Sequence, residues 1–312
     1  MKYWLSTIAV FSITLIVAQF SAAQESKPVI VASTTQIADF ARQVAGDRAV
    51  VKSILAPGAD PHTYQPTPND VQIVLGADLC LENGLHLEGK SWMATLAKDA
   101  NKPLVTTTDG IKLLTVSEGG EDIADPHAWF SPRNAAVYVN NIVRGISQID
   151  PANKEEYEAR ATLFLQQLRV LDSWVREQIS RIPADRRILV TTHDAFNYFC
   201  REFKLNANND YLSIAPVGWS TGAEVGAGIT PERRRKVVQS LKESGAPAIF
   251  VETSVPPRYV QALREAVRAR GFAVEIGGSL YSDSLGDPGT PQESYEGTVR
   301  ANVETVVTAL GG

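Results

Sequence analysis

Short apolar runs alternate along the chain with longer segments in which apolar residues recur every three or four positions. The first pattern predicts strands and the second predicts helices, and their alternation is typical of βα units around a largely parallel sheet. Strands are expected at Val29–Ser33, Val50–Leu55, Leu79–Glu82, Leu104–Thr106, Ile188–Thr192, Leu212–Val217, Ala248–Glu252 and Ala273–Ile276. The sequence therefore predicts an α/β fold with two similar lobes, over residues 24–150 and 183–312.

The clearest helical pattern lies between the two lobes, over Pro151–Ile182. Asp150 is a suitable N-cap, Pro151 fits the first helical position, and Pro183 ends the pattern. The apolar positions are Tyr157, Ala161, Phe164, Leu168, Leu171, Val175, Ile179 and Ile182. At 1.5 Å per residue this helix would be roughly 48 Å long, which predicts one rigid helix joining the lobes.

The first 23 residues have the pattern of an export signal. Lys2 precedes an apolar core, Ile8–Ala18, that is too short to span a bilayer, and the small residues Ser21–Ala23 follow it. We expect cleavage after Ala23. Because no cysteine lies near that position, we expect no lipid attachment, and the mature protein is predicted to be soluble in the periplasm.

Composition and charge narrow the possible partners. The 312 residues are 44% hydrophobic and 21% charged, which is typical of a soluble globular protein, and the formal net charge is −5. This balance argues against nucleic acid as a partner, because phosphates require a basic surface. Cys80 lies in a strand-like run and Cys200 in a helical one, so we favour two separate buried thiols over a disulfide.

The chain has only four histidines, and three lie in loops where open α/β sheets bind ligands. His62 lies in P-G-A-D-P-H-T-Y-Q-P-T-P, His127 in D-P-H-A-W-F-S-P, and His193 follows a strand in V-T-T-H-D-A-F. A proline stiffens the backbone before the first two, and a nearby aspartate offers a hydrogen bond to the ring. His86 lies between leucines at a helix start and is interpreted as a non-ligand.

Rigidly held imidazoles suit a divalent transition metal, and an anionic side chain should complete the set. Asp283 is the best placed, in G-G-S-L-Y-S-D-S-L-G-D after the last expected strand. The candidate metal ligands are therefore His62, His127, His193 and Asp283. Ordinary surface histidines are the less favoured alternative, because three occur on comparable loops.

Two motif matches indicate other functions and are expected to be coincidental. Residues 84–91, G-L-H-L-E-G-K-S, fit a phosphate-binding loop, but leucines and Glu88 stand where phosphate would approach the backbone amides. Residues 218–222, G-W-S-T-G, fit a serine-hydrolase elbow, but that fold needs a histidine after the serine and the sequence has none after His193. The zinc-peptidase motif H-E-x-x-H is absent from the sequence.

Over nearly all the mature chain, the sequence resembles the zinc and manganese receptors of ABC-type metal importers, the cluster A-I substrate-binding proteins. The resemblance rests on the segments around the four candidate ligands and on A-D-L-C-L-E-N-G-L-H-L-E-G. It implies two α/β lobes joined by one long helix, with a metal between them held by His62 and His127 from one lobe and His193 and Asp283 from the other. It also implies a non-enzymatic receptor whose partners are a membrane permease and its ATPase.

Two departures from the family pattern bear on the choice of metal. Many zinc receptors of this family carry a long His- and acid-rich loop before the second ligand, whereas this chain has the short T-V-S-E-G-G-E-D-I-A-D. Manganese and iron receptors tend to have Glu at the third ligand position, where this chain has His193. Three imidazoles and one carboxylate favour zinc, with manganese next, because manganese prefers more oxygen.

Two other classes of function remain open at this point. A secreted metallohydrolase would use the same four ligands with an activated water, and Glu224 or Asp194 would be its general base. An adhesin on the same fold would bind cell-surface partners through a patch that sequence does not reveal. The receptor is favoured, and we expect a monomer.

Overall fold

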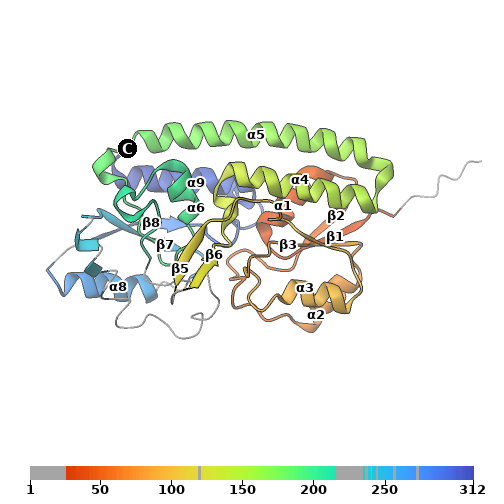
Figure 1. Cartoon of the computed structure of the whole chain (residues 1–312), viewed down its shortest axis with the longest axis horizontal. Coiled ribbons are helices and arrows are strands. Elements are labelled where there is room, and N and C mark those ends of the chain that lie inside the picture. The colour runs from red at the N-terminus through yellow and green to blue at the C-terminus, as the bar shows by residue number, and fades with distance from the viewer. Residues whose placement is uncertain are drawn as a thin grey trace, which may run out of the picture.

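The computed structural model describes residues 26–118, 121–215, 245–255, 258–271 and 274–312, with residues 235, 238, 239 and 241–243. The expected export signal, the G-W-S-T-G motif at 218–222 and Glu224 lie outside the described residues. Figure 1 shows two α/β regions that lie side by side along one long helix. The expected α/β fold, with parallel sheets and a long helix, is confirmed.

The N-terminal region is built on a parallel four-stranded sheet with the order β2-β1-β3-β4. Its strands are β1 (Val29–Ala32), β2 (Val50–Ser53), β3 (Leu79–Glu82) and β4 (Leu104–Thr106), and its helices are α1 (Thr35–Ala45), α2 (Pro68–Leu75) and α3 (Trp92–Asp99). Alternate residues of β3 face opposite layers: Leu79 and Leu81 pack on the side of α1, and Cys80 packs on the side of α2 and α3. All four expected strands are present. The inner strands β1 and β3 are the continuous buried runs expected for a sheet covered on both faces, whereas the edge strand β2 is partly exposed.

The C-terminal region has a smaller sheet with the same order. Its described strands, β7 (Ala248–Glu252) and β8 (Glu275–Leu280), pair in parallel. Val190 pairs with Ile214 in a parallel bridge, and the Phe250 N–H donates to the Val190 carbonyl oxygen at 2.8 Å. The order Ile214, Val190, β7, β8 therefore repeats the order of the first sheet.

For two strands of this sheet, the predicted length is wrong because the structure forms less pairing than the sequence pattern predicts. Within the described residues, Ile188–Thr192 and Leu212–Val217 form a single bridge and no longer ladder, and residues 216 and 217 lie outside the described part. The Asn206 side chain accepts from the Leu189 N–H at 2.6 Å, and it donates to the Leu189 carbonyl oxygen at 2.8 Å, which also accepts from the Ile214 N–H at 3.2 Å. A side-chain amide thus satisfies the Leu189 N–H, which the pattern assigns to a neighbouring strand.

The last strand is also displaced from its expected position. The sequence predicts Ala273–Ile276, of which residue 273 is not described, whereas β8 continues to Leu280 through Gly277 and Gly278. A register shift against β7 and a φ of 135° at Gly278 accommodate this continuation. Because glycine adopts such a conformation readily, the glycine pair forms an irregular stretch of strand instead of ending it.

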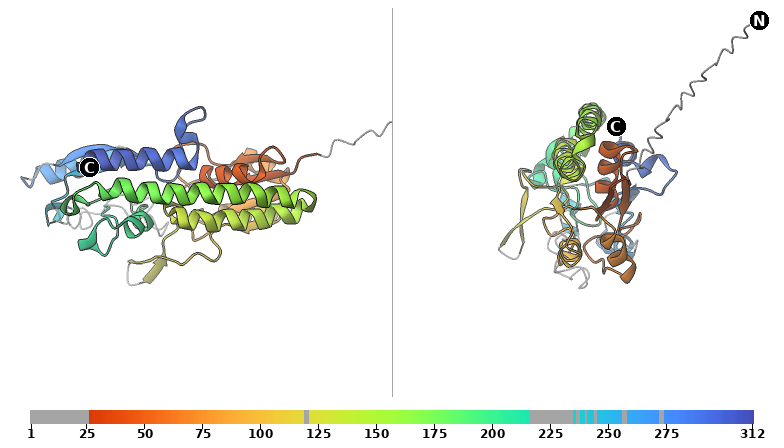
Figure 2. Two further views of the ribbon diagram at one scale, coloured as in Figure 1. Left: turned by 90° about the horizontal axis from the view of Figure 1, so that it is seen from above. Right: turned by 90° about the vertical axis from the view of Figure 1, so that its right-hand side faces the viewer.

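The long helix α5 (Lys154–Ser180) runs past both regions and packs against α1, α4 (Pro132–Ile149) and α9 (Tyr295–Leu310). Seen from above in Figure 2, α5 lies between α4 and α9. Its buried residues are those of the apolar pattern: Tyr157, Ala161, Phe164, Leu168, Leu171, Val175 and Ile179. The three long helices thus form one layer that holds the two sheets beside each other.

The start of the long helix differs from the expectation. Pro151–Asn153 form a 3₁₀ turn, and α5 begins at Lys154. Asp150 is the N-cap residue of this turn, and its carboxylate accepts hydrogen bonds from the Asn153 side chain at 2.8 Å and from the Tyr157 hydroxyl. The turn between α4 and α5 is therefore fixed by side chains.

The remaining elements are short. They are the helices α6 (Asn197–Phe203) and α8 (Arg258–Arg268), the antiparallel pair β5 (Thr115–Glu118) and β6 (Glu121–Ala124), and 3₁₀ turns at Ala128–Phe130, Ala184–Arg186, Ala207–Asn209 and Pro291–Glu293. The sequence pattern did not predict the β5–β6 pair. Cys80 and Cys200 are separate buried thiols, as expected. Among the described helices, none is long and apolar enough to cross a membrane.

Candidate metal site

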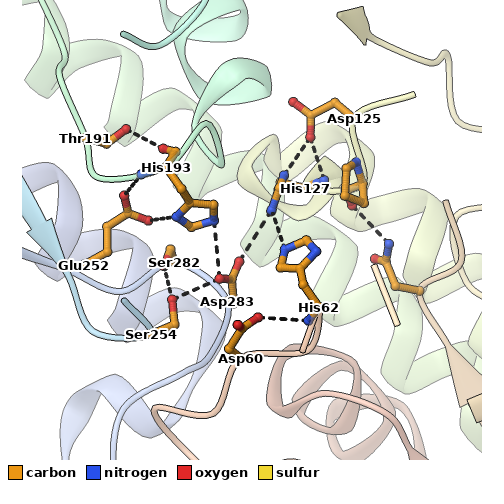
Figure 3. A network of polar contacts seen from close by, with 12 residues as sticks. Asp60, His62, Asp125, His127, Thr191, His193, Glu252, Ser254, Ser282 and Asp283 are labelled. Carbon is orange, nitrogen blue, oxygen red and sulfur yellow. Dashed lines mark hydrogen bonds and ion pairs between the residues drawn. The ribbon is translucent and has the colours of Figure 1, made fainter. Parts of the chain in front are cut away.

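Four side chains from separate loops meet between the two sheets (Figure 3). His62 follows β2, His127 precedes α4, His193 follows the Val190 bridge, and Asp283 follows β8. Each residue offers one potential ligand atom, and these four atoms all lie within 4.8 Å of one another. All four residues are buried. The structure thus brings together every candidate ligand that the sequence indicates.

The facing atoms have the spacing of ligands around a single ion. His62 Nε2 and His127 Nε2 are 3.2 Å apart, His127 Nε2 and Asp283 Oδ1 are 3.5 Å apart, and His193 Nε2 and Asp283 Oδ2 are 3.3 Å apart. Ligands at 2.0–2.1 Å from a tetrahedral metal are separated from one another by about 3.3 Å. The donor atoms therefore already lie close to coordination geometry.

The backbone around His62 is fixed by its own loop and by the segment that follows β3. The Asp60 carboxylate accepts from the His62 N–H at 2.9 Å, and the Trp92 indole donates to the Pro61 carbonyl oxygen at 3.2 Å. Gly89 lies so close that a Cβ there would be 2.5 Å from the His62 carbonyl oxygen. Its φ of 53° and this contact both favour glycine at position 89.

The same segment carries the phosphate-loop match, and its contacts support the expectation that the match is coincidental. The buried Glu88 carboxylate accepts hydrogen bonds from the Asn83 N–H at 2.7 Å and from the Gly84 N–H at 3.1 Å. A bound phosphate would need loop amides that are free to donate to it, whereas these two already donate to Glu88. His86 is exposed and does not belong to the ligand cluster among the described residues.

His127 is oriented by the aspartate of its own Asp-Pro-His tripeptide. The Asp125 Oδ1 atom accepts from the His127 backbone N–H and from Nδ1, each at 2.8 Å, which turns Nε2 toward the site. The Asn83 amide donates to the Pro126 carbonyl oxygen at 3.0 Å, and the Tyr138 hydroxyl donates to Asn83 Oδ1 at 2.5 Å. The end of β3 and helix α4 together fix this loop.

His193 is oriented by Glu252, the last residue of β7, which sequence reasoning missed. Glu252 Oε1 accepts from the backbone N–H groups of Thr192 at 2.7 Å and His193 at 2.8 Å, and Oε2 lies 2.5 Å from His193 Nδ1. This carboxylate lies 59 residues from the histidine along the chain. The available signal was an acidic residue at the carboxyl end of an expected buried strand, Ala248–Glu252.

Asp283 belongs to the loop between β8 and α9, and this loop is bound to the first helix of the chain. The Gln36 amide donates to the Ser282 carbonyl oxygen at 3.3 Å, and the Leu285 N–H donates to the Thr35 hydroxyl at 2.8 Å. These contacts span about 250 residues of sequence. The fourth candidate ligand is therefore held from both regions at once.

Burial and neighbouring charges set the protonation of the histidines. Burial alone would lower the pKa of His193, but the carboxylates of Glu252 and Asp283 outweigh it and raise that pKa well above its usual value. The pKa of His127 is raised in the same way by Asp125 and Asp283, against the effect of burial.

The pKa values of the other two candidate ligands, His62 and Asp283, are lowered instead. Burial lowers the pKa of His62 to about 3, so this ring is neutral near pH 7 and ready to donate a lone pair. Burial would raise the pKa of Asp283, but the adjacent imidazoles hold it well below its usual range. The cluster thus combines a carboxylate, a neutral imidazole and two imidazoles that a cation can deprotonate.

Relatives of the chain are metal-binding proteins. It matches the family model described as zinc-uptake complex component A, periplasmic, over residues 30–309. It is 36% identical to the zinc-binding protein TroA of Treponema pallidum, over 93% of this chain and 91% of that protein. It is 35% identical to the manganese-binding lipoprotein MntA of Bacillus subtilis, over 90% and 89%, and 36% identical to the iron-binding protein YfeA of Yersinia pestis, over 90% and 86%.

Solved structures agree with the fold. The periplasmic zinc-binding protein TroA from Treponema pallidum superposes with a TM-score of 0.84 at 35% identity, covering 92% of this chain and 100% of that one. A manganese-bound periplasmic metal-binding protein from Candidatus Liberibacter asiaticus has a TM-score of 0.76 at 27% identity, covering 91% and 100%. Because the family match spans both regions and all four candidate ligands, this chain belongs to the family of the periplasmic zinc-uptake component A, which are substrate-binding proteins of metal ABC transporters.

Proposed function

We propose that this protein is a periplasmic receptor that binds one divalent metal ion and delivers it to an ABC-type permease and its ATPase in the inner membrane. The observation that carries the proposal is the buried set of three imidazoles and one carboxylate, His62, His127, His193 and Asp283, whose ligand atoms lie within 4.8 Å of one another, with three contacts of 3.2–3.5 Å. Family membership supports the transport role, since several relatives are named metal ABC transporter substrate-binding lipoproteins.

For the metal, we favour zinc and rank manganese second. The relatives are named for zinc, manganese and iron at nearly equal identity, so overall similarity does not select among these metals. The donor set supports zinc, because imidazole suits zinc whereas manganese prefers more oxygen ligands. His193 is the deciding residue, since it supplies the third nitrogen.

We further propose that the site holds cargo and performs no catalysis. A catalytic zinc site keeps an open position for water and a general base beside it. Here two neighbouring carboxylates, Asp125 and Glu252, are each bound to a ligand histidine. Of the two residues considered as a base, Glu224 lies outside the described residues.

The mature protein in this proposal begins after Ala23, carries no lipid and acts as a monomer. The small residues Ser21–Ala23 support the cut, and the lack of a cysteine beside them supports the absence of a lipid. It differs from the relative MntA of Bacillus subtilis, which is named a lipoprotein. Mass spectrometry of the exported protein tests the position of the cut, and light scattering tests the monomer.

The function is tested by metal analysis of purified mature protein, followed by competition between zinc and manganese. We expect one metal per chain, tighter binding of zinc, and a higher melting temperature with either metal. A ligand at 100 times its dissociation constant stabilises the folded state by about 2.7 kcal/mol. His62→Ala should abolish this stabilisation, and His86→Ala, which changes a histidine outside the cluster, should preserve it.

Several outcomes would overturn parts of this proposal. A melting curve of verified apo protein that neither zinc nor manganese changes would refute the receptor. Tighter binding of manganese would refute the choice of zinc and leave the receptor intact. A zinc-dependent hydrolase activity that His62→Ala removes would instead support the metallohydrolase.

A further inference from the structure

The carboxyl end of β7 contacts both candidate ligands of the C-terminal region. Glu252, the last residue of the strand, lies against His193, and Ser254, two residues later, lies against Asp283 (Figure 3). The first contact holds an imidazole in the manner common for metal-binding histidines. The second contact places a hydroxyl donor against the carboxylate of the fourth candidate ligand.

The two oxygens of Asp283 have different surroundings. Oδ2 accepts a hydrogen bond from the Ser254 hydroxyl at 2.9 Å and also lies 3.3 Å from His193 Nε2. Oδ1 has no hydrogen-bond partner among the described residues and lies 3.5 Å from His127 Nε2. By setting the rotation of the carboxylate about its Cβ–Cγ axis, the serine bond holds Oδ2 beside His193 Nε2 and directs Oδ1 toward His127 Nε2.

A second hydroxyl supports the first. Ser282 Oγ lies 2.6 Å from Ser254 Oγ, and Ser282 is buried whereas Ser254 is partly buried. A hydroxyl has one proton to donate. Because Ser254 gives its proton to Asp283, Ser282 donates to Ser254, and such a chain of hydrogen bonds strengthens each of its members.

We propose that Ser254, supported by Ser282, is a positioning residue for the Asp283 ligand and tunes the selectivity of the site toward oxygen-preferring metals. The inference rests on the proposed metal-receptor function. Without Ser254, the carboxylate would rotate among orientations and bind metal at an entropic cost. Zinc retains three imidazoles in that case, whereas manganese depends more strongly on its carboxylate ligand. The loss should therefore weaken manganese binding more than zinc binding.

The test compares Ser254→Ala with wild type by competition titration of zinc and manganese, starting from apo protein. Loss of a residue that orients a metal ligand typically costs 10- to 100-fold in metal affinity. We expect a loss of about tenfold for zinc and a larger loss for manganese, so that the ratio of zinc to manganese affinity rises several-fold. The melting temperature of the apo variant shows whether it is folded.

Three matched measurements keep the outcome specific. Ser254→Thr retains the hydroxyl and should restore both affinities, and Thr253→Ala removes a hydroxyl from the exposed neighbouring side chain and should change neither. X-ray absorption of the manganese-loaded protein should show greater static disorder in the oxygen shell of Ser254→Ala. A purely structural role would lower the apo melting temperature and leave the affinity ratio unchanged.

The results distinguish this inference from the function on which it rests. If the wild type binds neither zinc nor manganese, the receptor proposal fails. If the wild type binds both and Ser254→Ala keeps the wild-type affinity ratio within twofold, only the role of Ser254 is refuted. A fall in the ratio would also refute it, because the carboxylate would then matter more for zinc.

Discussion

The Asp39 carboxylate in α1 accepts a hydrogen bond at 2.9 Å from the backbone N–H of Tyr295, the first residue of α9, although 256 positions separate the two in the sequence. Both residues are buried. Because the loop that carries Asp283 ends at Tyr295, this bond anchors one end of the loop to the N-terminal region. The Thr35 hydroxyl, one turn earlier in α1, accepts from Leu285 within the same loop.

Asp39→Ala is expected to destabilise the protein and to weaken metal binding. Removing the acceptor leaves the buried Tyr295 N–H unpaired, which costs about 1–3 kcal/mol of unfolding free energy. Denaturant unfolding of the apo protein measures the cost, and titration with zinc measures the affinity. Gln43→Ala is the control, because the exposed Gln43 side chain contacts the same carboxylate at 3.4 Å and its loss should cost within about 0.5 kcal/mol. Equal effects of the two variants would contradict the anchoring role.

Metal binding is expected to release protons and to weaken as the pH falls. The carboxylates beside His193 and His127 raise the pKa of both rings, so the apo site holds protons that an incoming cation must displace. A group with a raised pKa loses its proton only as the pH rises, and metal affinity should therefore increase with pH across the neutral range. His62 contributes no proton near pH 7, since its pKa lies at about 3.

Calorimetry in buffers of different ionisation enthalpy measures this proton release. At pH 7 the observed binding enthalpy should vary with the ionisation enthalpy of the buffer, and the slope gives the number of protons released. This number should be the same for zinc and manganese, because the protons leave the protein and not the metal. A binding enthalpy that does not depend on the buffer would show that the apo histidines are already neutral. That result would remove the electrostatic basis of the prediction.

The sequence predicts most of the architecture because the first sheet is covered on both faces. Buried strands such as β3 (Leu79–Glu82) then appear as continuous apolar runs that pattern analysis detects. In the second sheet, the Asn206 side chain bonds to the backbone of Leu189 and shortens the expected strand, and Gly277 and Gly278 lie within β8 rather than beyond it. Both differences depend on tertiary contacts that a local pattern does not contain.

The same distinction applies to the candidate site. His62 and His127 have a local signal, the Asp-Pro-His tripeptide, and its aspartate does orient His127. Glu252 and Ser254 have no such signal, because they approach His193 and Asp283 from a different strand end. A residue that acts on a ligand across the fold becomes visible only when the strand order is known.

Lys90→Ala is expected to leave folding and metal binding nearly unchanged. Lys90 is exposed, and the loop amides that a phosphate would use are bound to the Glu88 carboxylate. Substitutions at exposed positions usually change stability by less than about 0.5 kcal/mol. Thermal unfolding and zinc titration check both properties. Saturable ATP binding by the wild type, lost in Lys90→Ala, would instead support a nucleotide site.

His193→Ala is expected to lose affinity for zinc and for manganese, because no other donor replaces the missing nitrogen. His193→Glu introduces the harder ligand that suits manganese. In this structure, however, the new carboxylate would face Glu252, whose Oε2 lies 2.5 Å from His193 Nδ1. Like charges at that distance repel, so the single variant should bind both metals weakly. Competition titration and the apo melting temperature measure the two effects.

The double variant His193→Glu with Glu252→Gln should restore binding and shift the preference toward manganese. A glutamine keeps the acceptor oxygen that Thr192 and His193 now use through their backbone N–H groups, and its amide donates to the new carboxylate. Each tenfold change in relative affinity corresponds to about 1.4 kcal/mol, which competition titration resolves. Glu252→Gln alone is the control. Its amide N–H groups would face the Nδ1–H of His193, so it should weaken the binding of both metals and leave zinc preferred. If His193→Ala binds zinc as tightly as wild type, His193 is not a ligand. If His193→Ala loses affinity but the double variant prefers zinc as the wild type does, His193 is a ligand and the argument for zinc fails.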